Sequence, residues 1–166
     1  MRKSKDEMYL DVAESMLSRS TCLRRAYGAA IVKNDEIIST GYNGSPRGRV
    51  NCSDRGLCIR EMLKVPAGER YELCLSTHGE ANAIISASRD KMIGASLYLV
   101  GHDVKTGKRL SVSEPCAMCK RLIINAGIKE VVSWNGDSIQ RVNVEDWVKE
   151  DEFESIYKKF HLDTFM

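Results

Sequence analysis

The sequence predicts an α/β fold, a three-layer α/β/α sandwich with a central mixed sheet. Segments with apolar side chains at helical spacing alternate along the chain with short β-rich runs. The expected order is helix, two hairpin strands, helix, strand, helix, strand, helix. Hydrophobic residues make up 43% of the chain and charged residues 29%, which is ordinary for a compact soluble protein. Such an alternation buries helices against a sheet, as in layered α/β proteins.

The first part of the chain supplies one helix and one hairpin. Residues 6–19 carry apolar side chains at helical spacing with charged ones opposite, which predicts an amphipathic helix. The runs 28–32 and 36–41 flank the polar pair Asn34-Asp35, a pattern typical of a β-hairpin. The next stretch, 41–48, is rich in turn residues and is predicted to be a loop.

Residues 49–76 are the least regular part of the sequence. We expect an insertion here, in which a short helix ends before Pro66. Long insertions inside compact domains are often functional. A buried helix is then predicted over 79–87, with Ser76 or Thr77 as its cap.

The last part of the chain continues the alternation. A strand is predicted over 95–100, a helix over 116–125 and a second strand over 129–134. Asn143 can cap a final helix over about 143–160. A chain of 166 residues can bury one self-sufficient core, so we expect a single domain over 1–166.

The net charge and the cysteine content limit the classes of function that the chain can have. The net charge of +2 is too small for a general polyanion-binding surface, so nucleic acid is not expected as a partner. The first residues lack the apolar region of a signal peptide, and no segment approaches a membrane span. We therefore expect a cytoplasmic protein without a membrane partner. In that reducing compartment, metal binding explains the six cysteines better than disulfides do.

Two short motifs carry the chemistry, His78-Gly79-Glu80 and Pro115-Cys116-Ala117-Met118-Cys119. The Cys-x-x-Cys pair opens a predicted helix, so Cys116 and Cys119 lie one turn apart and point the same way. With His78 they form three ligands of the types that zinc prefers, and three ligands leave a fourth position for water, as in a catalytic zinc site. Glu80 is close enough to face that water without being a ligand, which suits a general acid and base.

The pairing of H-x-E with P-C-x-x-C is the signature of zinc nucleobase deaminases. A Cys-x-x-Cys pair alone is also compatible with a redox pair or half of a structural zinc site. The upstream His-x-Glu favours the catalytic interpretation.

Over residues 7–134 the chain resembles the cytidine-deaminase-like superfamily, and within it most closely the deoxycytidylate (dCMP) deaminases. Besides the zinc motifs, the resemblance includes 28–33, the loop 41–48 and Asn82-Ala83-Ile84. On its own the Asn43 loop is most simply a surface turn, but the resemblance implies that Asn43 contacts substrate. The family usually has His-Ala-Glu where this chain has Gly79, whose backbone N–H remains available to the base carbonyl.

The resemblance implies hydrolytic deamination of dCMP to dUMP and ammonia in pyrimidine deoxynucleotide metabolism, with zinc and Glu80 carrying the reaction. Family members are commonly homo-oligomers, often hexamers, and several respond to dCTP and dTTP as allosteric effectors. Two alternatives stay open. One is deamination of another substrate, such as cytidine, dCTP or tRNA adenosine, since the zinc core is shared. The other is a non-catalytic, zinc-stabilised nucleotide-binding protein, for which Glu80 would have no use.

A substrate phosphate should be held by arginine or backbone N–H groups near the open zinc position. The arginines that flank the suspected substrate loop are the candidates, and each could equally be solvated surface charge. They are Arg24, Arg25, Arg47 and Arg49.

The remaining cysteines have the number of thiols that a closed structural zinc site needs. They are Cys22, Cys52, Cys58 and Cys74. Some dCMP deaminases carry a second zinc, and Cys22 and Cys52 match cysteine positions of that site, whereas the other two are an extension argued from the irregular segment. Free buried thiols are the alternative. We expect a second, structural zinc ion.

Overall fold

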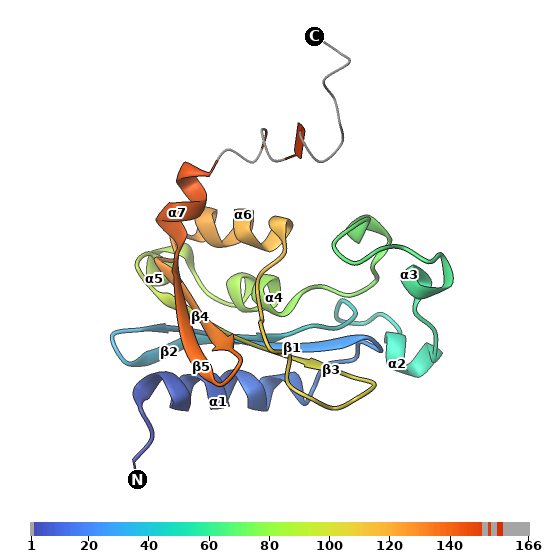
Figure 1. Cartoon of the computed structure of the whole chain (residues 1–166), viewed down its shortest axis with the longest axis horizontal. Helices are drawn as coiled ribbons and strands as arrows, with labels where there is room; N and C mark the ends of the chain where they lie inside the picture. Colours follow the sequence, from blue (N-terminus) through green and yellow to red (C-terminus); the bar gives the residue numbers. More distant parts are fainter. Residues whose placement is uncertain (1, 151–152, 154–155, 158–166) are drawn as a thin grey trace.

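A five-stranded mixed sheet organises the fold (Figure 1). The computed structural model describes residues 2–150, 153, 156 and 157. The strand order is β2-β1-β3-β4-β5, with β3 and β4 parallel and the other neighbours antiparallel. The strands are β1 (Arg25–Lys33), β2 (Glu36–Tyr42), β3 (Ser96–Asp103), β4 (Glu130–Asn135) and β5 (Ser138–Asn143).

Helices cover both faces of this sheet, which confirms the predicted three layers. Helix α1 (Lys5–Leu17) lies on one face, as Figure 1 shows. The opposite face carries α4 (Gly79–Ile85), α5 (Arg89–Met92), α6 (Ala117–Ala126) and α7 (Val144–Lys149). In the part of the chain that the structure describes, no helix is long and apolar enough to cross a membrane.

The alternation of side chains along the strands builds two cores. In β1, Ala29 and Ile31 point to the four-helix face, and Ala30 and Val32 point to α1. Because both faces of a covered sheet are buried, such a strand is apolar along its whole length. This is why the predicted strands were visible as short apolar runs.

Two elements of the second half were not predicted, the short helix α5 and the strand β5. The exposed outer strand β5 carries polar side chains such as Gln140 and Arg141, so it lacks an apolar run. Asn143 caps α7 as predicted, since its Oδ1 accepts from the N–H of Glu145 at 3.0 Å. Helix α7 ends at Lys149, and most of the predicted continuation to residue 160 lies outside the described residues.

The predicted cap of the helix after residue 78 is wrong. Its N-cap is His78, with extended backbone angles of φ −72° and ψ 154°, so that Gly79 is the first helical residue. The His78 side chain makes no capping hydrogen bond to the helix. The imidazole is therefore free to act as a ligand at the helix start.

The segment between β2 and α4 consists of short helical turns joined by loops. They are α2 (Cys52–Arg55), α3 (Ile59–Met62) and the 3₁₀ helix η1 (Tyr71–Leu73). Its two ends are joined by an antiparallel bridge between Gly44 and Thr77. The Gly44 N–H donates to the Thr77 carbonyl at 3.1 Å, and the Thr77 N–H donates back at 2.8 Å. We call residues 45–76 the insertion.

Close backbone packing fixes the start of α4 on the sheet. A Cβ placed on Gly41 in β2 would lie 2.2 Å from the carbonyl oxygen of Gly79 and 2.4 Å from the nitrogen of Ala83. No side chain fits in that space, so glycine is required there. The first turn of α4, which carries both His78 and Glu80 at its start, rests directly on the backbone of β2.

Candidate active site and metal centre

Three side chains from two helix starts converge to form a candidate metal centre. His78 is the N-cap of α4, Cys116 is the N-cap of α6 and Cys119 lies in the first turn of α6. The Nδ1 atom of His78 is 3.5 Å from the Sγ atom of Cys116 and 3.4 Å from that of Cys119. The three ligand atoms all lie within 4.8 Å of one another.

This donor set fits zinc. With Zn–S bonds of about 2.3 Å and Zn–N bonds of about 2.0 Å, a tetrahedral ion separates its sulfur and nitrogen ligands by about 3.5 Å. The two observed separations between the imidazole nitrogen and the sulfurs match that spacing. Two thiolates and one imidazole are also ligands of the softness that zinc selects. The imidazole nitrogen is therefore placed at zinc-ligand spacing from both sulfurs.

The close approach of these groups changes the pKa values of both thiols. The pKa of the Cys116 thiol lies well below its usual range, first because of its hydrogen bond with Cys119 and then because of its hydrogen bond with His78. The pKa of Cys119 is raised, because it keeps the proton that it donates to Cys116. The pair therefore favours one thiolate even without an ion, and thiolate is the form that binds metal.

Glu80 lies beside this cluster in the first turn of α4. Its side chain is only 3% exposed. Burial is the first cause of a raised pKa for its carboxyl group, because a charged carboxylate loses its hydration there. A carboxyl group with a raised pKa holds and releases a proton nearer to neutral pH than an exposed one, which suits general acid–base chemistry.

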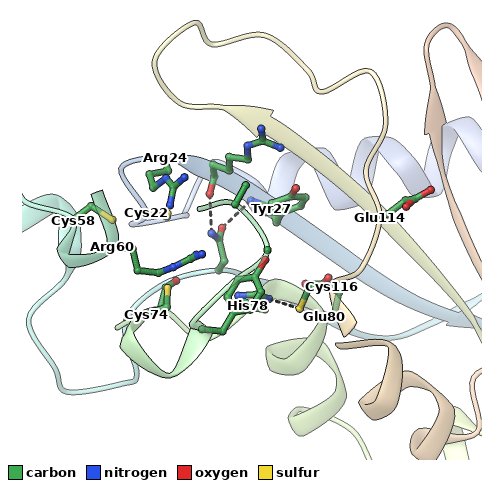
Figure 2. Close-up of a pocket in the computed structure, with 16 residues that line it drawn as sticks. Cys22, Arg24, Tyr27, Cys58, Arg60, Cys74, His78, Glu80, Glu114 and Cys116 are labelled. Atoms are coloured by element: carbon green, nitrogen blue, oxygen red, sulfur yellow. Dashed lines mark hydrogen bonds between the residues drawn. The ribbon is translucent and has the colours of Figure 1, made fainter. Parts of the chain in front are cut away.

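A cavity of about 160 Å³ opens over these residues. Its lining includes His78, Glu80, Cys116 and Tyr27, which Figure 2 shows. Asn43 is also a lining residue. The insertion contributes further lining residues, among them Cys58, Arg60, Tyr71 and Cys74. The candidate centre is therefore accessible from a pocket built by two separate parts of the chain.

Asn43 lines the cavity, but the scaffold already uses most of its amide. Its Oδ1 accepts from the Ser20 hydroxyl and from the Tyr27 N–H, both at 2.7 Å. Its Nδ2 donates to the Arg25 carbonyl at 2.8 Å. One amide hydrogen remains for a ligand, so the side chain primarily fixes the loop before β1.

The four candidate arginines separate into two pairs. Arg24 and Arg25 line the cavity, and Arg24 also lies 3.6 Å from the carboxylate of Glu61. Arg47 and Arg49 are exposed and are not among the lining residues. The reason is a turn after Pro46, closed by a hydrogen bond from the Arg49 N–H, which carries this part of the loop into solvent.

The remaining cysteines gather in one region without forming a closed site. Cys22, Cys58 and Cys74 line the cavity, and all four cysteines outside the candidate centre are free thiols. Burial raises the pKa of the Cys52 thiol, and the other three thiols lie close enough to raise it further. Within the described residues, however, His78, Cys116 and Cys119 form the only group of three or more such ligands within 4.8 Å.

Arg60, Tyr71 and Tyr27 were not singled out from the sequence. Arg60 and Tyr71 lie in the insertion, where no periodicity or motif distinguishes them. Tyr27 lies in a strand, where an aromatic residue is ordinarily a packing residue. Their common property is the cavity that they line, which is a property of the fold and not of the local sequence.

Known proteins share both the fold and the motifs of this chain. Residues 3–134 match the family described as "Cytidine and deoxycytidylate deaminase zinc-binding region". The deoxycytidylate deaminase of Mycobacterium phage D29 is 36% identical over 132 residues, which cover 76% of this chain and 91% of that protein. The Schizosaccharomyces pombe deoxycytidylate deaminase is 35% identical over 140 residues, 82% of this chain. The match spans only 40% of the longer yeast protein.

A solved structure supports the same relationship. The dCMP deaminase of cyanophage S-TIM5 in its apo form has a TM-score of 0.54 and 27% identity, with 80% of this chain and 84% of that chain covered. That enzyme has also been solved in complex with dCMP and dUMP. The sequence match extends over both zinc motifs, and the similarity of fold extends over most of the chain. The chain therefore belongs to the cytidine and deoxycytidylate deaminase family.

Proposed function

We propose that this protein catalyses the hydrolytic deamination of dCMP to dUMP and ammonia. The observation that carries the proposal is the convergence of His78, Cys116 and Cys119 beside the buried carboxyl group of Glu80 at an open cavity. The substrate assignment is supported by relatives named deoxycytidylate deaminase and by a similar phage enzyme solved with dCMP and dUMP.

In this proposal, His78, Cys116 and Cys119 hold one zinc ion. Zinc bound by three protein ligands supplies a Lewis acid that lowers the pKa of a coordinated water toward about 7. Glu80 accepts one proton from the attacking water and delivers it to N3 of the base. It then accepts the remaining proton of the new hydroxyl group at C4 and delivers it to the departing amino group. Its raised pKa allows it to act in both directions. The N–H groups in the first turn of α4, including that of Gly79, lack helical acceptors and can bind the base carbonyl.

The test is ammonia release by the zinc-loaded protein with dCMP, deoxycytidine, cytidine, dCTP and tRNA as substrates. We expect dCMP to be converted with the highest kcat/KM. Activity confined to cytidine, dCTP or tRNA would overturn the substrate assignment. Complete inactivity of both the wild type and Glu80→Ala on all of them would instead favour a zinc-stabilised binding protein.

A second zinc ion is part of the proposal and is tested separately. Its support is the proximity of Cys22, Cys58 and Cys74 to Cys52, although their sulfurs must move closer to complete a tetrahedral site. We expect two zinc ions per chain, falling to one in Cys58→Ser or Cys74→Ser with catalytic zinc retained. One zinc ion per wild-type chain, in protein purified without chelator, would refute it.

We also propose that the chain forms a cytoplasmic homo-oligomer with dCTP and dTTP as effectors, as family resemblance implies. Large apolar side chains are exposed on the neighbouring helices α4 and α6, with Ile85 73% exposed, Met118 53% and Leu122 42%. Exposed apolar groups of this size favour association. Light scattering should give a mass of several chains, and a lower mass for Leu122→Lys. A monomeric wild type would contradict self-association.

A further inference from the structure

Arg60 is a buried cation that the reaction described above leaves without a role. It belongs to α3 in the insertion, and its side chain is only 7% exposed. It nevertheless lines the cavity, and Figure 2 shows its side chain extending toward the side where His78 lies. Arginine is rarely buried so completely unless it is paired.

The hydrogen bonds of Arg60 hold its position and leave its charge in place. Its Nη2 group donates to the backbone carbonyl of Pro66 at 3.1 Å and to that of Glu69 at 2.6 Å. Its Nε is buried and has no hydrogen-bond partner among the residues that the structure describes. Carbonyl groups accept hydrogen bonds without neutralising a guanidinium ion. An unpartnered buried donor of this kind is rare in native proteins and calls for an explanation.

An aromatic ring links Arg60 to the candidate metal centre. The guanidinium carbon lies 4.5 Å from the ring centroid of Tyr71, over its face. The Tyr71 ring in turn meets the imidazole of His78 edge-on, with centroids 5.0 Å apart and planes at 81°. Arg60 and His78 therefore contact the same aromatic ring, so that the guanidinium group lies one residue away from the candidate metal centre.

Of the three arginines that line the cavity, Arg60 is the buried one, whereas Arg24 is half-buried and Arg25 is exposed. Arg24 lines the same cavity, but Glu61 lies 3.6 Å from it. The exposed Glu72 pairs with Arg70 at 3.0 Å, and this hydrogen bond is the first cause of its lowered pKa, to which Arg60 adds less. The acidic lining residues, Glu80 and Glu114, do not hydrogen-bond to Arg60 in the described chain.

We propose that Arg60 binds the 5′-phosphate of the nucleotide and thereby selects dCMP over the nucleoside. This inference rests on the proposed function and extends it to a residue in the insertion. A guanidinium group presents paired N–H donors that match the oxygens of a phosphate. The bonds to Pro66 and Glu69 use only Nη2, so they leave other N–H donors of the group for a ligand and keep it in place before substrate arrives.

The test compares dCMP with deoxycytidine in Arg60→Gln, Arg60→Lys and the wild type. Arg55→Gln is the matched control, because Arg55 is an exposed arginine of the same insertion outside the cavity lining. Arg60→Gln should lower kcat/KM for dCMP by about 30-fold, mainly through KM, since a charge-assisted hydrogen bond is lost. Turnover of deoxycytidine should change by less than about twofold, and Arg60→Lys should recover part of the loss. Equal losses on both substrates would overturn the proposal and indicate a purely structural role.

Product binding tests the same contact without any turnover. Calorimetry should show that Arg60→Gln weakens binding of dUMP but not of deoxyuridine, whereas Arg55→Gln weakens neither. If the wild type deaminates neither substrate, the proposed function fails, and dUMP binding still decides the role of Arg60. Unchanged dUMP affinity in Arg60→Gln would overturn the phosphate contact. If Arg60→Gln does not fold, Arg60→Lys gives the same comparison. A smaller loss of affinity for dUMP alone would support the phosphate contact, and an unchanged affinity would refute it.

Discussion

The two sides of the cavity are built in different ways. His78, Glu80 and Cys116 lie at the starts of helices that pack on the central sheet, and Gly41 seals α4 against β2. The insertion side rests on helices of four residues or fewer, with Leu57 57% exposed, Met62 60% and Leu63 56%. The reacting groups therefore lie on elements of the main core. The residue proposed to select the substrate lies in a segment that has little core of its own.

The largest expected effect lies on the sheet side. Glu80→Gln should lower dCMP deamination by about 10³-fold, because proton transfer by a positioned side chain typically contributes 10² to 10⁴ in rate. Metal analysis of the purified variant should show that zinc is retained, since Glu80 is not part of the ligand group. Residual activity within tenfold of the wild type would remove Glu80 from the mechanism.

Truncating a leucine on each side of the cavity should show how much each side contributes to the free energy of unfolding. Leu99 is fully buried in β3, so Leu99→Ala should reduce the free energy of unfolding by about 3–4 kcal/mol. Leu63→Ala, at an exposed leucine of the insertion, should reduce it by less than about 0.5 kcal/mol. Urea denaturation followed by circular dichroism measures both. Comparable losses would mean that the insertion is a full part of the core.

Two glycine substitutions test how tightly the sheet side is packed. Gly41→Ala should destabilise the protein by about 2–3 kcal/mol, because its Cβ would overlap the backbone of α4. Gly79→Ala is the control, since its nearest contact would be 3.2 Å, to the Tyr27 carbonyl. There a helix-propensity gain of about 0.5–1 kcal/mol offsets the tight contact. Thermal unfolding that ranks Gly79→Ala as the more damaging change would contradict this packing.

The smallest effect concerns the burial of Glu80. Folding raises the pKa of its carboxyl group, so between the two pKa values the folded state binds more protons than the unfolded state. The stability of the wild type therefore falls as the pH rises through that window. In chelator-treated protein, Glu80→Gln should be more stable than the wild type at neutral pH. The difference in stability between the two proteins should vanish below pH 4.5, the ordinary pKa of a glutamate carboxyl group. A difference that stays constant with pH would show that the burial of charge on Glu80 is not its cause.

The features that the sequence predicted well are those with a local physical signal. The hairpin turn at Asn34 and Asp35 has φ angles of 51° and 64°, a conformation that these two residue types tolerate. The zinc motifs are short and chemically specific, so the convergence of His78, Cys116 and Cys119 could be anticipated before their elements were placed.

The features that escaped prediction depend on distant parts of the chain. Strand β5 pairs through its backbone, which its polar side chains do not reveal. Arg60 resembled any other arginine of the insertion until the fold placed it, buried, in the cavity wall. Arg47 and Arg49 were equally plausible phosphate contacts from their position in the sequence, and a single turn after Pro46 directs them into solvent.

The bridge between Gly44 and Thr77 has a consequence for how this protein could be altered. Because two backbone hydrogen bonds hold the ends of the insertion together, its length is nearly decoupled from the sheet. Doubling the length of a closed loop changes its closure entropy by only about 0.6 kcal/mol. A segment of different length and composition could therefore be exchanged at this bridge. Substrate range could be redesigned there while the reacting groups keep their positions.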